Sequence, residues 1–332
     1  MKKQALAWLF AGLCLASAAA QASSSFSKLV IFGDSLSDSG NNALLVGTDG
    51  GQVISGDDYF ARIPFASGRY TNGPVWAERF AAQLGLQAQP SLLGGSNYAF
   101  GGAETGVDGT DGPGGFPFSM RTQLGMFLAN TGGVAASDAL YVVAGGGNNV
   151  RAAMGAIAAG ADPFPTIASA AAAYANDIGG IVNSLQAAGA KNILVWNTPN
   201  FGLTPAALSA GPMGGYLGTA LSTAMNDALA FQMAGEDVGV RSFDMFGFVS
   251  NAVANSAALG FSNVTKACGS PTAGCDPATA LFYDGIHPTD LGHQLLAQGV
   301  YAAVVPEPAS YLLLGGGLAL LAWRRRAVQS AA

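Results

Sequence analysis

The sequence is poor in charge and in histidine. Only 10% of its 332 residues are charged, against roughly 25% in an ordinary soluble domain. Its two histidines are His287 and His293, so histidine chemistry of any kind must use one of these two side chains. A chain with so little charge is typical of an exported protein.

Basic residues are especially scarce in the body of the chain. Between residues 23 and 305 there are nine Lys and Arg against 19 Asp and Glu, which gives a net charge near −10. Nucleic acids and anionic lipid surfaces are bound by clusters of Lys and Arg that neutralise phosphates. The sequence therefore excludes nucleic acid as an expected partner.

Cysteine is also rare, and no convincing metal site is present. Cys14 lies in the N-terminal segment, whereas Cys268 and Cys275 stand seven apart in a Gly- and Pro-rich loop. In an exported protein this pair predicts a local disulfide. The Asp- and Gly-rich loop at 107–115 resembles a calcium loop but lacks a full set of ligand positions, so we expect a flexible connection there.

The N-terminus is typical of a secretory signal peptide. Lys2 and Lys3 precede an apolar stretch at 5–16, and the small residues that follow end in Ala20-Gln21-Ala22. This order predicts a signal peptide over residues 1–22. The alternative is an N-terminal core helix.

The C-terminus combines a Pro-Glu-Pro element, an apolar run at 309–323 and the cluster Arg324-Arg325-Arg326. Fifteen apolar residues are fewer than the roughly 20 of a spanning helix, so we expect at most a minimal or transient contact with the inner membrane. Residues 305–332 resemble the PEP-CTERM sorting signal of Gram-negative bacteria. That resemblance implies an exosortase-type sorting protease as partner and a periplasmic, cell-surface or extracellular location. The alternative is an ordinary C-terminal membrane anchor.

Between the two ends, strands alternate with helices in one predicted domain, residues 23–304. Alternation of this kind favours an α/β fold with a parallel sheet covered on both faces. Short β-branched runs predict strands at 29–32, 139–143, 192–196 and 238–243, with a weaker one at 97–100. Longer amphipathic or Ala-rich stretches predict helices at 75–84, 121–130, 167–188, 216–234 and 291–300.

Polar and glycine residues follow three of the predicted strands, where an open parallel sheet binds its ligands. Ser35 follows the first strand, Gly101-Gly102 the weak one and Asn148 the third. Each alone is typical of a turn. Just before the last helix, however, Asp284 precedes His287 by three residues, so a base and a group that fixes its tautomer stand close together.

Five ordered blocks resemble the GDSL, or SGNH, hydrolases of the exported bacterial lipase and esterase branch. They are FGDSLSDSGNN at 32–42, GRYTNGPVWAERFAAQLG at 68–85, NYAFGGAET at 97–105, GGGNN at 145–149 and YDGIHPT at 283–289. The resemblance implies a flavodoxin-like three-layer α/β/α sandwich with a parallel five-stranded sheet. It also implies hydrolysis of carboxylic esters without a metal or cofactor.

Carried over by position, the resemblance assigns five catalytic residues. Ser35 is the nucleophile, His287 the base and Asp284 the residue that orients it. The backbone N–H of Ser35, that of Gly102 (with Gly101 as the close alternative) and the side chain of Asn148 form the oxyanion hole. His293 is expected to be a packing or surface residue of the last helix. One departure is Asn149, where the family usually has Asp, and it predicts altered hydrogen bonding behind the site.

The leading hypothesis is therefore a secreted serine ester hydrolase acting on a small-molecule, lipid or acetylated-carbohydrate ester. Two alternatives remain open, a carbohydrate O-acetylesterase acting on extracellular polysaccharide and a catalytically silent surface or matrix protein. The loops expected to form the pocket, 43–66, 103–120 and 200–215, carry no diagnostic residues. Phe116, Pro117 and Phe118 suit the wall of an acyl pocket or packing on the domain.

Overall fold

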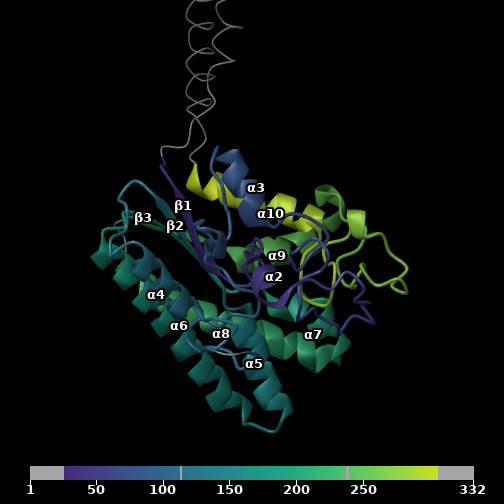
Figure 1. Ribbon diagram of the computed structural model, residues 1–332. Coiled ribbons are helices and arrows are strands. Elements are labelled where there is room, and N and C mark those ends of the chain that lie inside the picture. The colour runs from purple at the N-terminus through teal and green to yellow at the C-terminus, as the bar shows by residue number, and fades with distance from the viewer. Residues whose placement is uncertain (1–25, 113, 237–238, 306–332) are drawn as a thin grey trace, which may run out of the picture. The chain divides into compact units, whose positions relative to one another are not determined.

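Four parallel strands form the sheet at the centre of the described chain. The computed structural model describes residues 26–112, 114–236 and 239–305. The strands are adjacent in chain order, and each neighbouring pair is parallel (Figure 1). Their bounds are Leu29–Gly33 (β1), Leu140–Ala144 (β2), Asn192–Trp196 (β3) and Val240–Phe243 (β4).

The strands are covered on both faces. Every residue of β1 and of β2 is buried, and their apolar, β-branched composition suits contact with helices on two sides. Leu29 pairs with Leu140, and Leu140 pairs with Asn192, so three strands begin at the same level. Their carboxyl ends consequently lie side by side.

Helices connect the strands and hold more residues than the strands do in the described chain. Parallel strands require such crossover connections. The helices are α2 (Asn41–Val46), α3 (Trp76–Gln83), α4 (Met120–Asn130), α5 (Gly147–Ala158), α6 (Pro163–Ala188), α7 (Pro205–Ser209), α8 (Gly211–Met233), α9 (Met245–Ala254) and α10 (Asp290–Val304).

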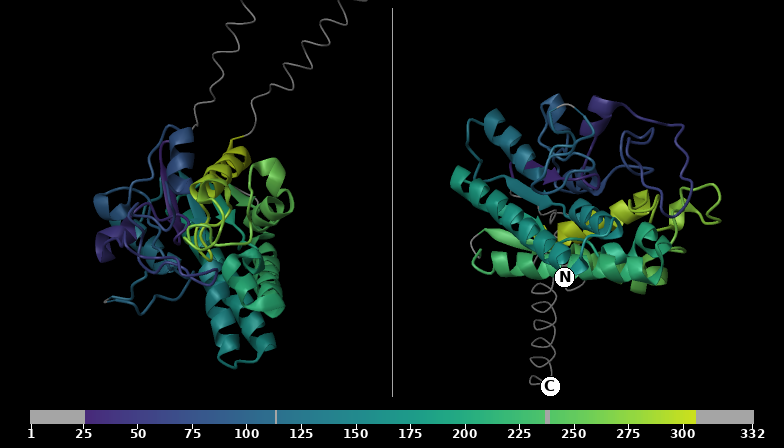
Figure 2. Two further views of the ribbon diagram at one scale, coloured as in Figure 1. Left: turned by 90° about the vertical axis from the view of Figure 1, so that its right-hand side faces the viewer. Right: turned by 90° about the horizontal axis from the view of Figure 1, so that it is seen from below.

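The helices form two layers, one on each face of the sheet. Helices α4, α5, α6 and α8 lie together on one side of the strands, and α3 and α10 lie on the other (Figures 1 and 2). Phe32 and Tyr141 of the sheet share a core with Ile178 of α6 on the first side. Trp196 of β3 contacts Trp76 of α3, with ring centroids 4.6 Å apart. The predicted α/β fold class is confirmed.

The number of strands differs from the prediction, because residues 97–100 do not form a fifth strand. The segment still pairs with β1 in parallel through a bridge between Ile31 and Asn97. The N–H groups of Tyr98 and Phe100 also donate to carbonyls of β1, at 2.8 and 3.2 Å. Asn97 Oδ1 accepts from the N–H of Ala99 at 3.0 Å, and Asn97 Nδ2 donates to the carbonyl of Ser37 at 2.7 Å. These side-chain bonds hold the segment against the turn that follows β1, while its backbone stays bonded to β1 as far as Phe100 without forming a regular strand.

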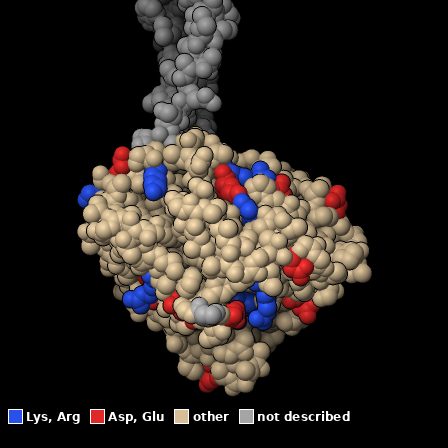
Figure 3. All heavy atoms as spheres, in the orientation of Figure 1, with Lys and Arg blue, Asp and Glu red and all other residues tan. Residues whose placement is uncertain are grey.

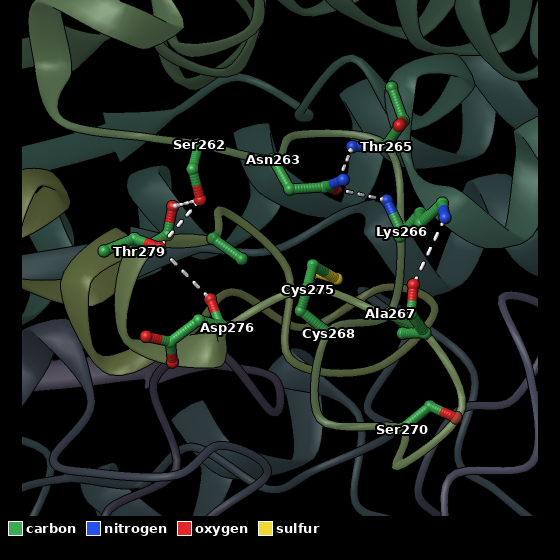
Figure 4. Close-up of a disulfide and its surroundings, with 12 residues drawn as sticks. Ser262, Asn263, Thr265, Lys266, Ala267, Cys268, Ser270, Cys275, Asp276 and Thr279 are labelled. Atoms are coloured by element: carbon green, nitrogen blue, oxygen red, sulfur yellow. Dashed lines mark hydrogen bonds between the residues drawn. A yellow bond between two sulfur atoms is a disulfide. The ribbon is translucent and has the colours of Figure 1, made fainter.

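The predicted disulfide between Cys268 and Cys275 is present (Figure 4). Next to it, the N–H of Gly269 donates to the carbonyl of Tyr283 at 2.7 Å, and the N–H of Ala267 donates to Asp57 Oδ1 at 2.8 Å. The loop closed by the disulfide is therefore bonded to the residue directly before Asp284.

Charge is sparse on the folded surface as well. Figure 3 shows Lys, Arg, Asp and Glu scattered over a face made mostly of other residues. Within the described ranges, no helix combines the length and hydropathy needed to cross a membrane, and no cluster of His, Cys, Asp and Glu is placed to hold a metal ion. The predicted signal peptide, residues 1–22, and residues 306–332 of the predicted sorting segment lie outside the described residues.

Candidate active site

Ser35 lies in the tight turn that follows β1. The carbonyl of Asp34 accepts from the N–H groups of Ser37 and Asp38, and Asp34 Oδ1 accepts from the N–H of Leu36 at 3.0 Å. These bonds turn the chain sharply at the carboxyl end of the strand and present the Ser35 side chain there. Burial raises the pKa of Asp34 to about 6, against the opposing effect of its bond to Leu36.

Ser35, His287 and Asp284 form one buried chain of contacts. His287 Nε2 lies 2.9 Å from Ser35 Oγ, and His287 Nδ1 lies 2.8 Å from Asp284 Oδ2. Asp284 is fully buried, and its carboxylate also accepts from the N–H groups of Ala61, Ile286 and His287. Because the carboxylate is fixed by these amides, it can hold the imidazole with Nδ1 protonated and Nε2 free to accept from the serine.

The two candidate glycines of the oxyanion hole are distinguished by what their amides contact. The N–H of Gly101 donates to Asp38 Oδ2 and Asn42 Oδ1, each at 3.1 Å. Among the described residues no acceptor faces the N–H of Gly102, which lines the same hollow as Ser35 and His287. Gly102 also has φ of +88°, a conformation that favours glycine. The free donor is thus at Gly102.

Asn148 stands in the first turn of α5, directly after the glycines that end the β2 connection. Its Nδ2 donates to the carbonyl of Ala103 at 2.9 Å, and its Oδ1 accepts from Arg151 at 3.0 Å. An amide nitrogen carries two hydrogens, so one remains for a ligand in the hollow that Asn148 shares with Ser35. Helix α5 was not among the helices predicted from the sequence, because its glycine-rich start suggested a loop.

Asn149, the departure from the family pattern, faces away from this chain of contacts. Its Oδ1 accepts from the N–H of Thr105 at 3.2 Å, and its Nδ2 donates to Thr105 Oγ1 at 3.0 Å. The Thr105 hydroxyl donates in turn to Asp177 Oδ2 at 2.9 Å, and Asp177 pairs with Arg121 at 3.2 Å. A carboxylate is therefore present behind the loop at 101–105, but α6 supplies it.

His293 lies apart from the active serine, in the interior of the molecule. Its Nδ1 accepts from the N–H of Trp76 at 3.1 Å, and it is almost completely buried. Burial lowers the pKa of His293 to about 3, so the ring is neutral throughout the physiological range. This side chain serves packing and the start of α3.

Two hollows meet at the serine, with Ser35, Asn148, Ile286 and His287 in the walls of both. The first, the apolar lobe, is lined mainly by apolar side chains, including Leu36, Phe201, Met245, Val249, Phe282 and Pro288. The second, the arginine lobe, is more polar and is lined by Phe60, Arg62, Tyr70, Phe116, Pro117 and Arg151, among others.

The three loops expected to form the pocket all reach these lobes, but their roles differ. Residues 43–66 and 103–120 contribute to the arginine lobe, and 200–215 contributes to the apolar lobe. Phe116 and Pro117 therefore line the arginine lobe, while Phe118 packs on Phe100 and lines neither lobe. Sequence reasoning missed Arg62 and Arg151, since isolated arginines in loops and helices carry no motif.

The fold and the site together define a class. A parallel α/β sandwich that carries a serine, a histidine and an aspartate in hydrogen-bond sequence, with amide donors beside the serine, has the arrangement of a serine hydrolase. The chain belongs to the GDSL-like Lipase/Acylhydrolase family, whose pattern its residues 29–300 match. Residues 304–326 match the PEP-CTERM protein-sorting motif, which indicates export.

Curated relatives of the chain include a protein named as an esterase. An uncharacterised protein of Pseudomonas putida is 31% identical over 94% of this chain and 54% of its own length. Esterase EstA of Pseudomonas aeruginosa is 30% identical over 91% of this chain and 51% of its own. The chain thus spans about half the length of these curated relatives. A carbohydrate acetylesterase from Sinorhizobium meliloti is 17% identical, with a TM-score of 0.39 over 83% of this chain and 98% of its own.

Proposed function

We propose that this protein is an exported serine hydrolase of carboxylic esters. The observation that carries the proposal is the buried chain from Ser35 Oγ through the His287 ring to Asp284, with contacts of 2.9 and 2.8 Å. A hydroxyl within reach of an imidazole whose second nitrogen is held by a carboxylate is activated as a nucleophile. The name of the relative Esterase EstA supports an ester as the bond cleaved.

In the first half of the reaction, Ser35 Oγ attacks the carbonyl carbon of the ester while its proton passes to His287 Nε2. The tetrahedral intermediate collapses, the bond to the alcohol oxygen breaks, and His287 returns the proton to that oxygen. In the second half, water loses a proton to His287 and attacks the acyl carbon on Ser35. The bond between that carbon and Ser35 Oγ then breaks, and His287 returns the proton to Oγ. The products are a carboxylic acid and an alcohol, and the enzyme is regenerated.

The developing oxyanion is stabilised by three donors. These are the N–H of Ser35, the N–H of Gly102 and the second amide hydrogen of Asn148, whose other hydrogen is held by Ala103. Donors fixed in advance by the fold need no reorganisation during the reaction, and one such donor is typically worth about 3 kcal/mol. The glycine leaves the approach to the carbonyl clear.

The proposal is tested by hydrolysis of p-nitrophenyl butyrate with two matched histidine variants. His287→Gln is expected to lower kcat by at least about 10³-fold, because the base is lost. His293→Gln is the control, since His293 contacts the backbone of α3. Equal activity of His287→Gln and the wild type would overturn the proposal, and both proteins are checked for folding by circular dichroism.

The alcohol and acyl parts of the natural ester are a separate question within this proposal. A lipid-type ester and an acetylated polysaccharide differ in acyl length, and the apolar lobe beside Ser35 favours an alkyl acyl group. A chain-length series of p-nitrophenyl esters, run beside acetylated xylan, distinguishes them. Preference for acetate and release from xylan would indicate a carbohydrate O-acetylesterase.

We further propose that the sorting motif delivers the protein to the periplasm, the cell surface or the medium. An exosortase-type protease is the partner expected to act at the match over residues 304–326. Cell fractionation with an antibody to the catalytic domain tests the location. Recovery of the protein in the cytoplasm alone would contradict it.

A further inference from the structure

The arginine lobe contains two cations that stand close together without a carboxylate partner. The guanidinium carbon of Arg151 lies 4.7 Å from the ring centroid of Phe60, and that of Arg62 lies 5.7 Å from the same centroid. In the described chain, neither arginine has a carboxylate oxygen within 4 Å, whereas Arg69, Arg79 and Arg121 each pair with one.

Arg151 has unused hydrogen-bonding capacity as well. One terminal nitrogen donates to Asn148 Oδ1, but its Nε is buried and has no partner among the described residues. An unsatisfied buried donor is costly, and a guanidinium matches the two oxygens of a carboxylate or phosphate with parallel N–H groups. The second terminal nitrogen also has no hydrogen bond in the described structure, and because Arg151 lines the lobe, a ligand oxygen there can reach the guanidinium group.

Glu104, Asp111 and Asp34 attract Arg151 at longer range, but none of them forms an ion pair with it in the described structure. Asp111 lines the lobe but is exposed at its edge, and Glu104 lies outside the residues that line it. Neither forms an ion pair with Arg62 or Arg151 in the described structure. Two neighbouring like charges repel, and a bound anion would relieve that repulsion.

We propose, on the basis of the ester hydrolase function proposed above, that the arginine lobe binds an anionic group on the alcohol part of the substrate. The apolar lobe takes the acyl group, and the ester carbonyl sits at Ser35, where the lobes meet. The class of substrate is thus an ester whose leaving alcohol carries a carboxylate or a phosphate.

The test uses two butyrate esters with the same acyl group, 4-carboxyphenyl butyrate and its neutral carboxamide analogue. We expect wild-type kcat/KM to favour the anionic ester by about tenfold, the effect of one charge-assisted contact. Arg62→Gln and Arg151→Gln should each reduce that ratio to about threefold or less. Arg151 also contacts Asn148, so Arg151→Gln is expected to lower kcat/KM for both esters. The ratio of the two kcat/KM values is therefore the readout.

Lys28→Gln is the matched control. It removes one positive charge from an exposed residue directly before β1, at the end of the strand away from Ser35. Its substrate ratio should equal that of the wild type. The wild-type preference should also fall as salt is raised, because the exposed Arg62 is screened. A third butyrate ester, in which a phosphate monoester replaces the carboxylate on the phenol, then shows by its kcat/KM which anion is favoured.

Two failures are distinguishable. If the wild type hydrolyses both esters with equal kcat/KM, or if neither arginine variant changes the ratio, the anion site is refuted and the esterase proposal stands. If the folded wild type hydrolyses neither ester, the esterase proposal fails. Calorimetric titration with 4-hydroxybenzoate then tests the anion site on its own. The anion site requires 4-hydroxybenzoate to bind severalfold more weakly to Arg62→Gln than to the wild type. Unchanged binding would refute the anion site.

Discussion

At the scale of single residues, the proposed oxyanion hole depends on which backbone N–H groups already donate a hydrogen bond within the fold. Gly101 and Gly102 are adjacent and alike in sequence, but Asp38 and Asn42 occupy the amide of Gly101. A Cβ on Gly101 would also collide with the ring of Tyr70. One glycine therefore serves the fold, and the other leaves its N–H to the hollow beside Ser35.

Asn148 gives the first prediction. Asn148→Ala is expected to lower kcat for p-nitrophenyl butyrate by about 10²- to 10³-fold with a smaller change in KM, because it removes a donor used mainly in the transition state. Steady-state kinetics measure this. Retention of more than a tenth of the wild-type kcat would exclude Asn148 from the oxyanion hole.

His293 gives a prediction about pH. Its pKa is about 3 in the folded protein, below the ordinary value of 6.5, because the ring is buried. As the pH falls below 6.5 the unfolded chain takes up a proton before the folded chain does, so the stability that depends on neutral His293 is complete above pH 6.5 and is lost toward pH 3. Between pH 6.5 and 5 this loss is about 2 kcal/mol.

The measurement compares urea unfolding of the wild type and His293→Asn across that range. The stability advantage of the wild type should shrink as the pH falls. Burial raises the pKa of Asp34 and of Asp38 to about 6, so these groups change stability with the opposite sign, but both proteins contain them and the effect cancels. A difference that is constant with pH would contradict the account.

The residues that the sequence singled out could be found because they stand close together in the chain or match the sequence blocks of the family. Asp284 and His287 are three apart in one turn, and Ser35 follows a strand that is easy to recognise. Arg62 and Arg151 could not be predicted, because they approach each other only through their common contact with Phe60. That proximity is a property of the folded chain.

At the scale of secondary structure, hydrophobic runs predicted the four strands and the long helices. One predicted strand, 97–100, did not form, and the helices α2, α5, α7 and α9 were not predicted. Residues 97–100 lie beside β1 and are bonded to it, but they form an isolated bridge and not a regular fifth strand. Helix α5 begins within the glycine-rich run at 145–147, and Gly146 has φ of +118° just before it.

The loop at 101–105, which contains Gly102 and Thr105, gives a prediction at this scale. Thr105 links it to α5 through Asn149 and to α6 through Asp177. Asn149→Asp would place a second carboxylate on one hydroxyl, which can donate to only one of them. We therefore expect this variant to lose about 1–3 kcal/mol of unfolding free energy at pH 7. Thr105→Val is the comparison, since it takes the hydroxyl partner away from both Asn149 Nδ2 and Asp177 Oδ2. An unchanged Tm in both variants would contradict the account.

The disulfide loop gives the second prediction at this scale. Closing a loop between cysteines seven apart restricts the unfolded chain, and the bond is worth about 2–3 kcal/mol. Replacing Cys268 and Cys275 with serine should lower the unfolding free energy by that amount in urea titrations. The loop is bonded to Tyr283, next to Asp284, so kcat should fall as well. The same stability in reduced and oxidised wild type would argue against this role.

At the scale of the whole molecule, low charge and an acidic balance accompany export. The sorting motif at 304–326 indicates it, and a disulfide forms readily in an oxidising compartment. Against this background two arginines without carboxylate partners beside the reactive serine are unusual. The proposed anion site rests on this pair of arginines.

The central claim is that Ser35 is an activated nucleophile, and covalent labelling with a fluorophosphonate tests it most directly. Intact-mass and peptide mass spectrometry should show one adduct per chain, on Ser35. The adduct should be absent in Ser35→Ala, strongly slowed in His287→Gln and unaffected in His293→Gln. A folded wild-type protein that stays unlabelled, or carries the label on another residue, would contradict the account.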